Sequence, residues 1–135
     1  MPFMNWNEML ATHIDSIDSQ HKVLLAYINE LHESMMNGAG NEKLGQILDN
    51  LVKYTVNHFG FEENLFKQHG YQFKDEHIKL HEDLKAQVGD FVKKFKSGEI
   101  TVSSDLMSFL KEWLMKHIIK EDKKYIVFLK SKGVV

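Results

Sequence analysis

Cysteine is absent from this chain of 135 residues, and proline occurs only once, at Pro2. The lack of cysteine excludes disulfide bonds, thiolate metal sites and cysteine nucleophiles. The lack of proline after Pro2 removes the strongest helix breaker and favours long helices. No apolar run approaches the length of a membrane span, and the first ten residues lack the basic and apolar regions of a signal peptide. We therefore expect a cytoplasmic protein that does not insert into a membrane.

An excess of positive charge is also missing. The formal net charge is −2, from 17 Lys and Arg against 19 Asp and Glu. Nucleic-acid binding is not indicated, because it requires a basic surface. Hydrophobic residues make up 43% and charged residues 27%, which is typical of a globular protein, and the length suits one domain. The unusual feature is the presence of eight histidines.

Glycine-rich stretches divide the chain into four segments. Loops are indicated by NGAGN at 37–41, HGYQ at 69–72 and KSGEITVSS at 96–104. Between them, apolar residues recur at spacings of three and four, which is the helical period. The predicted helices cover about 19–37, 42–69, 72–97 and 103–131, after an N-terminal arm at 1–18. This pattern predicts an all-α fold, an up-down-up-down antiparallel four-helix bundle forming one domain over residues 1–135.

Histidines and carboxylates interrupt the apolar stripes of these helices. The stretch DEHIKLHEDL places His77 and His81 four residues apart on one face, and HFGFE does the same for His58 and Glu62. Polar residues also occupy or adjoin the stripes of the first and fourth helices, at His21 and His117 respectively. Unpaired polar groups are costly in a core, so several together indicate a shared partner, most simply a metal ion.

The distance from a shared loop predicts the height of each residue in an antiparallel bundle, at about 1.5 Å per residue. His21 lies 17 residues before Gly38, and His58 lies 17 residues after Asn41. The remaining candidate ligands also lie at similar distances on the two sides of the loops at 69–72 and 96–104. All of them are therefore expected to lie in one layer.

The other three histidines are expected to lie outside this layer. His32 lies 11 residues after His21, and His69 lies 11 residues after His58. Each separation is roughly 16 Å along the helix axis. His13 belongs to the arm. We interpret these three as ordinary polar or surface residues.

The fourth helix offers two neighbouring carboxylates. Glu121 has the easier i+4 spacing from His117, but it falls with lysines on a charged face. Asp122 falls on the apolar stripe with Ile118 and Tyr125. We therefore predict that Asp122 is the ligand, with local π-type widening of the helix to accommodate the i+5 spacing.

Five histidines and two carboxylates overfill one tetrahedral zinc site. Two octahedral ions offer about 12 positions. The histidines fill five of these, two bridging carboxylates fill four, and one bridging solvent oxygen fills two. One position stays open, which suits a small diatomic ligand. A nitrogen-rich ligand set favours iron over magnesium or calcium, while manganese and zinc remain alternatives.

The complete pattern, H…HxxxE…HxxxH…HxxxxD, resembles hemerythrin, in its single-domain bacterial form, bacteriohemerythrin. The resemblance covers essentially the whole chain. It implies a non-haem centre of two iron ions with an oxo or hydroxo bridge, which binds dioxygen reversibly as hydroperoxide. The metal ligands that it implies are His77, His81 and His117 on one iron, His21 and His58 on the other, and Glu62 and Asp122 as bridges. Dioxygen would bind to the iron that has only two histidines.

The resemblance also implies an apolar oxygen pocket, which maps onto Leu24, Phe59, Trp113, Leu114 and Ile118. Ordinary core packing would bury the same five residues. Three polar neighbours of the ligands, at positions 19, 20 and 63 (Ser, Gln and Glu), are expected to be surface residues.

The resemblance favours an oxygen carrier, store or local supplier rather than an enzyme. A di-iron peroxidase, a nitric-oxide-handling enzyme and an oxygen-sensing domain are the alternatives. The expected partner is dioxygen, together with an oxygen-accepting enzyme that the sequence does not identify. We expect a monomer, because exchange of a small ligand needs no subunit contact.

Overall fold

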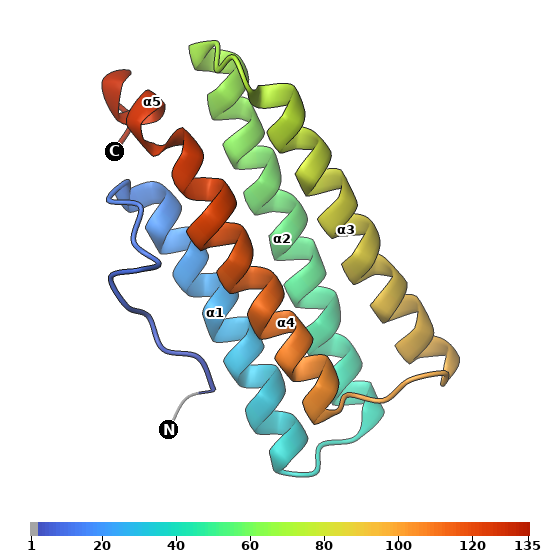
Figure 1. Cartoon of the computed structure of the whole chain (residues 1–135). Coiled ribbons are helices and arrows are strands. Elements are labelled where there is room, and N and C mark those ends of the chain that lie inside the picture. Colours follow the sequence, from blue (N-terminus) through green and yellow to red (C-terminus); the bar gives the residue numbers. More distant parts are fainter. Residues whose placement is uncertain (1–2) are drawn as a thin grey trace.

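A computed structural model describes residues 3–135, while residues 1 and 2 of the predicted arm lie outside the described residues. The described part contains four long helical segments packed side by side and no strand (Figure 1). The first three are α1 (Asp15–Met36), α2 (Asn41–His69) and α3 (Lys74–Ser97). The fourth is composed of α4 (Ser104–Lys116), η1 (His117–Glu121), η2 (Asp122–Tyr125) and α5 (Ile126–Ser131). Consecutive segments run in opposite directions, so the predicted antiparallel four-helix bundle is confirmed.

The ends of the helices follow from local sequence. Gly70 and Gly98 end α2 and α3 with φ values of 71° and 85°, a conformation that favours glycine. The Ser103 side chain caps α4 by accepting a hydrogen bond of 3.2 Å from the Leu106 backbone N–H. These caps fix the positions at which α2, α3 and α4 begin or end. Within the described residues, no helix is long and apolar enough to cross a membrane.

The first helix begins at Asp15, earlier than the predicted position of about 19. Ile17 is fully buried and extends the apolar stripe back by one turn from His21. The Asp18 carboxylate accepts hydrogen bonds from the backbone N–H groups of Thr12 and His13, at 2.8 and 3.1 Å. These bonds hold the end of the arm against the helix. The first helical turn therefore begins at Asp15, before the predicted apolar stripe starts.

Two apolar clusters lie on either side of the predicted polar layer. The larger cluster includes Leu24 and Ile28, which follow His21 on α1, and the smaller includes Ile17, which precedes it. Burial of each such side chain contributes roughly 1.5–3 kcal/mol to stability. The layer of polar side chains is therefore enclosed by packed core on both sides.

Candidate metal centre

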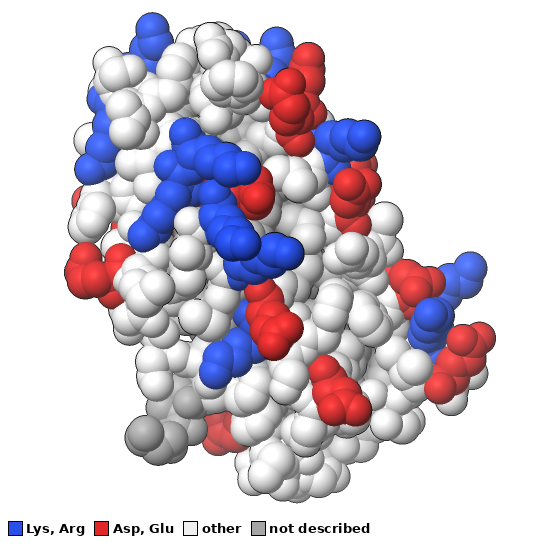
Figure 2. All heavy atoms as spheres, viewed as in Figure 1, with Lys and Arg blue, Asp and Glu red and all other residues white. Residues whose placement is uncertain are grey.

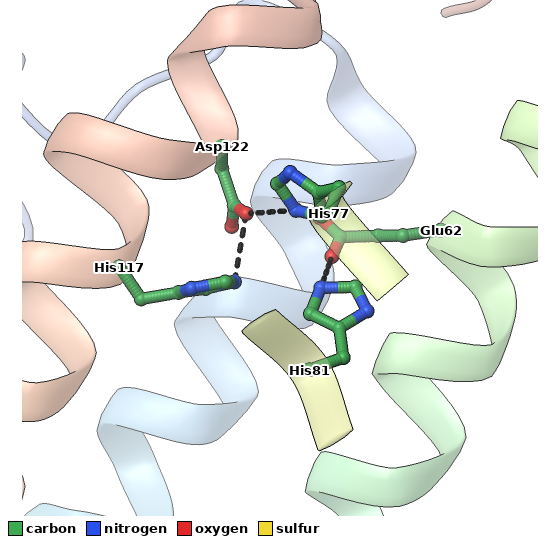
Figure 3. Close-up of side chains that lie close together, drawn as sticks. All are labelled: Glu62, His77, His81, His117 and Asp122. Carbon is green, nitrogen blue, oxygen red and sulfur yellow. Dashed lines mark hydrogen bonds and ion pairs between the residues drawn. The ribbon is translucent and has the colours of Figure 1, made fainter. Parts of the chain in front are cut away.

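The structure brings all seven predicted ligands together in the interior. They form two groups that share Glu62 and Asp122, and within each group one ligand atom per residue lies within 4.8 Å of the others. The first group adds His77, His81 and His117 to the shared carboxylates, as Figure 3 shows. The second adds His21 and His58. Three histidines therefore surround one position and two surround the other, with both carboxylates available to each.

Asp122 is the point at which three helical segments meet. Its Oδ1 lies 2.8 Å from Nε2 of His117 and 3.2 Å from Nε2 of His77. Its Oδ2 lies 3.0 Å from Nε2 of His21. The two oxygens of one carboxylate thus point toward histidines of different groups, as a carboxylate that bridges two ions would.

Glu62 is placed in the same way from α2. Its Oε1 lies 3.1 Å from Nε2 of His81, and its Oε2 lies 3.5 Å from Nε2 of His58. His58 is one turn before Glu62 on the same helix, and His81 approaches from α3. The two oxygens of Glu62 thus also point toward histidines of different groups.

Many of these buried atoms lie close to an oppositely charged group but make no hydrogen bond of good geometry within the described part of the chain. They are both ring nitrogens of His21, Nε2 of His58, His81 and His117, Oε1 of Glu62 and Oδ2 of Asp122. Buried polar groups without partners are costly and rare in native proteins. Convergent imidazole nitrogens and carboxylate oxygens are, in contrast, the donor set that transition metals prefer. The residues present therefore fit a pair of metal ions.

The backbone of the fourth segment explains why Asp122 faces inward. A π-helical turn covers His117–Glu121, so the predicted widening is present. The extra residue in this turn brings the i+5 residue Asp122 to the inner face, where its side chain is fully buried. The Glu121 side chain is instead partly exposed and lies 3.0 Å from Nζ of Lys124.

The buried carboxylates and histidines of the cluster shift each other's pKa values. Burial would raise the pKa of the Asp122 carboxyl, but the charge of His117 and the hydrogen bonds of His117, His21 and His77 together outweigh burial and hold this pKa well below its usual range. Burial would lower the pKa of His117, but the charge and hydrogen bond of Asp122, together with the negative charges of Glu62 and Glu121, outweigh burial and raise this pKa. The carboxylate thus stays ionised in the interior, as a metal ligand requires.

Two further residues belong to the site, and their predicted role as surface residues was wrong. Nδ1 of His58 donates a hydrogen bond of 2.6 Å to Oε1 of Gln20, and Nδ1 of His81 donates one of 2.9 Å to Oε2 of Glu63. These bonds place the proton on Nδ1 and leave Nε2 of each ring free to bind a metal. Each partner follows or precedes a ligand by one position, so it points about 100° away, toward a neighbouring helix. Ser19 is exposed, as expected.

The comparisons with known proteins agree with this geometry. A family model described as the hemerythrin HHE cation binding domain matches residues 12–129. The chain belongs to the hemerythrin family. Bacteriohemerythrin from Methylococcus capsulatus is 36% identical over 126 residues, which cover 93% of this chain and 95% of that protein. Myohemerythrin from Theromyzon tessulatum is 32% identical over 120 residues, covering 89% of this chain and 88% of that protein.

Solved structures of the hemerythrin family share the same fold. A crystal structure of a wild-type hemerythrin has a TM-score of 0.87 and 34% identity, covering 94% of this chain and 98% of that chain. Bacteriohemerythrin from Pseudomonas aeruginosa is 36% identical over 93% of this chain and 81% of its own length. The similarity therefore extends over nearly the whole bundle.

Tyr125 contacts the proposed ligand Glu62, a role that was not predicted from its position on the apolar stripe. Its buried hydroxyl donates a hydrogen bond to Oε2 of Glu62. The ring centroid lies 5.4 Å from that of His77 and 5.1 Å from that of Phe66. Burial, together with the negative charges of Asp122 and Glu62, raises the pKa of Tyr125 well above its usual value. The phenol therefore stays protonated and can hold the Glu62 carboxylate in place.

The five residues of the predicted hemerythrin oxygen pocket are all buried in the larger apolar cluster: Leu24, Phe59, Trp113, Leu114 and Ile118. Phe59 stacks on His81, with ring centroids 3.9 Å apart and planes inclined by 7°. Phe59 thus lies flat against one histidine of the site, and the other four residues lie in the same apolar cluster.

The remaining histidines lie elsewhere in the bundle. His13 is exposed, and the ring of His32 stacks on Phe3 with a centroid distance of 4.2 Å. His69 is the last residue of α2. None of the three joins the buried groups around Glu62 and Asp122.

Proposed function

We propose that this protein binds dioxygen reversibly at a non-haem di-iron centre. The observation that carries the proposal is the pair of buried ligand groups sharing two carboxylates, in a chain of the hemerythrin family. We assign the ligands as His77, His81 and His117 on one iron, His21 and His58 on the other, and Glu62 and Asp122 as bridges, with an oxo or hydroxo group from solvent. Two iron ions supply two electrons for reversible binding of one dioxygen molecule.

The protein's own residues set the conditions for that binding. Gln20 and Glu63 orient the imidazoles of His58 and His81 through Nδ1. Tyr125 holds Glu62 through its hydroxyl. This arrangement fixes the ligands before a metal arrives, which is the property expected of a site that must not rearrange with each cycle.

The apolar walls exclude water and protons from the centre. Leu114 lies one turn before His117, and Leu24 lies one turn after His21. Both side chains are buried at 2% exposure or less. A dry, apolar pocket disfavours the separation of charge that would release a reduced oxygen species. The walls therefore favour departure of the ligand as dioxygen.

We propose a monomeric, cytoplasmic carrier, store or local supplier of dioxygen. Peroxidase activity, nitric oxide chemistry or oxygen sensing at the same centre would use the same ligands. An enzyme would show turnover with its substrate, whereas a carrier forms a stable complex.

The test is the optical spectrum of the reduced protein on exposure to air, with iron counted in the same sample. We expect about two irons per chain and a stable new absorbance; immediate bleaching to the oxidised spectrum would contradict the carrier function.

A matched pair of variants tests the ligand assignment. His77→Ala is expected to lower iron content, because it removes a buried imidazole and leaves the other ligands without their ion. His69→Ala, at the last residue of α2 and outside the metal layer, is expected to keep the wild-type iron content. Equal iron content in both variants would show that the assignment is wrong.

A further inference from the structure

The two proposed metal positions differ in the groups that accept the Nδ1 proton of their histidines. In the group with three histidines, Nδ1 of His81 lies 2.9 Å from Oε2 of Glu63, a carboxylate oxygen. In the group with two histidines, Nδ1 of His58 lies 2.6 Å from Oε1 of Gln20, an amide oxygen. Only the first of these contacts brings a negative charge to a ring. The two positions are therefore unequal in charge beyond their direct ligands.

No lysine pairs with Glu63 in the described part of the chain. Among residues 3–135, its only ion-pair contact is the one with His81. The His81 side chain is fully buried and that of Glu63 is 15% exposed, so salt and water screen this contact less than they would on the open surface. Glu63 therefore places an unneutralised negative charge at one ring of the three-histidine position.

Neither histidine of the two-histidine position has a carboxylate at Nδ1. Gln20 is neutral, and Nδ1 of His21 is buried without a hydrogen-bond partner among the described residues. The carboxylates Glu62 and Asp122 are common to both positions, so they do not distinguish them. The difference in charge outside the ligands thus rests on one pair of residues, Gln20 and Glu63.

This difference has a direct consequence for iron. A carboxylate that accepts the N–H of a metal-bound imidazole makes the ring a stronger electron donor. A stronger donor stabilises ferric iron relative to ferrous iron, and so lowers the reduction potential of the ion that it binds. An amide acceptor has a smaller effect, because it carries no net charge. The charge of Glu63 therefore acts in the same direction as the third histidine of its group.

We propose that Glu63 and Gln20 set unequal reduction potentials for the two irons, with the lower potential at the three-histidine position. The inference rests on the proposed function in taking both metal ions to be iron. When the oxidised protein is reduced, the first electron enters the two-histidine iron and the second enters the three-histidine iron. The iron proposed to bind dioxygen is thus the last to be oxidised when electrons leave one at a time. Each residue acts through the histidine that it contacts.

The test is a potentiometric titration of the iron-loaded protein under inert gas. The two one-electron steps are followed optically and by the electron paramagnetic resonance signal of the half-reduced protein. Glu63→Gln keeps an acceptor for His81 but removes the charge. It should raise the potential of the second step by about tenfold in the ratio of ferric to ferrous iron at a fixed potential, which is about 59 mV. The first step should move much less.

Gln20→Glu makes the opposite change at the other position. It places a carboxylate where the amide contacts His58, so it should lower the potential of the first step by about tenfold in the same ratio. The double variant, Gln20→Glu with Glu63→Gln, keeps the net charge of the wild type, so a long-range effect of charge cancels in it. We expect the equilibrium constant for forming the half-reduced protein from the oxidised and reduced forms to fall by about a hundredfold.

Two exposed neighbours provide matched controls for charge. Ser19→Glu adds a carboxylate one position before Gln20, and Glu82→Gln removes one at the position after His81. Both side chains are exposed, and the Glu82 carboxylate lies 2.7 Å from Nζ of Lys85. Both control variants should leave each potential close to that of the wild type.

The outcomes separate this inference from the proposed function. Equal shifts of both steps in Glu63→Gln or Gln20→Glu, or shifts as large in the controls, would overturn the inference even if the protein binds dioxygen reversibly. If Glu63→Gln does not retain iron, Gln20→Glu tests the same asymmetry, because it keeps an acceptor for His58. Potentials that move as expected in a protein that never releases dioxygen would contradict the proposed function alone. A chain that binds no iron would contradict both.

Discussion

At the scale of single residues, the partners of the histidine rings decide how well the centre can hold metal. The Glu63 carboxylate accepts the Nδ1 proton of His81 and is itself only partly buried. It thereby fixes the ring so that Nε2 faces Glu62, at 3.1 Å from Oε1. A residue that never touches the metal is thus expected to control its affinity.

Glu63→Leu tests this role. The variant removes the acceptor of the His81 N–H, so the ring loses its orientation and part of its basicity. We expect iron affinity to fall by about 10- to 100-fold, as measured by competition with a chelator. Glu82→Leu, at an exposed glutamate of α3, provides the control. Equal affinities for the two variants would exclude the proposed role of Glu63.

Leu114 tests the apolar wall. Leu114→Asn introduces a polar amide beside the centre, which admits water and favours charge separation. We expect the variant to retain its iron and to bind oxygen, but the oxygenated protein should decay to the oxidised form about tenfold faster, which corresponds to roughly 1.4 kcal/mol. The decay is followed optically at fixed pH, beside Lys94→Asn at a surface lysine that pairs with Asp90. An unchanged decay rate at full iron content would remove Leu114 from the mechanism.

At the scale of secondary-structure elements, the π-helical turn at His117–Glu121 determines which carboxylate enters the core. A regular α-helix would place Glu121, at i+4, beneath His117. The wider turn shifts this relationship by one residue, and the chain then tightens into the η2 turn Asp122–Tyr125. The same change brings the Tyr125 hydroxyl to Glu62. This local distortion therefore places both Asp122, a proposed bridging ligand, and Tyr125, which contacts Glu62.

A pair of variants tests the consequence of this turn. Asp122→Asn should lose iron, because it removes a buried negative charge that faces three histidines. Glu121→Gln should keep iron, because it alters only a partly exposed contact with Lys124. Iron content per chain is measured in both. Loss of iron from Glu121→Gln with retention in Asp122→Asn would reverse the assignment.

The helices themselves could be predicted because each carries a strong apolar period between glycine loops. The start of α1 could not, since it depends on the contact of Asp18 with the backbone of residues 12 and 13, which no periodicity encodes. The roles of Gln20 and Glu63 were missed for a related reason. Both residues lie off the apolar stripe, and their importance depends on which neighbouring helix they face.

At the scale of the whole molecule, the bundle encloses a polar layer between two apolar clusters. The surface groove between α3 and the fourth segment is lined in part by His117, a residue of this layer. Figure 2 shows lysines gathered on the face that carries α4 and the turns after it, although the whole chain has a net charge of −2. The interior layer, rather than this surface charge, carries the proposed function.

The most direct test of the account is the stoichiometry of oxygen uptake and release by the reduced, iron-loaded protein. Oxygen is measured with an electrode while the optical spectrum is recorded through repeated cycles of air and inert gas. We expect uptake of about one dioxygen molecule per chain for about two irons, and its return as dioxygen with recovery of the reduced spectrum. Uptake without release, with conversion to the oxidised spectrum in the first cycle, would contradict reversible oxygen binding.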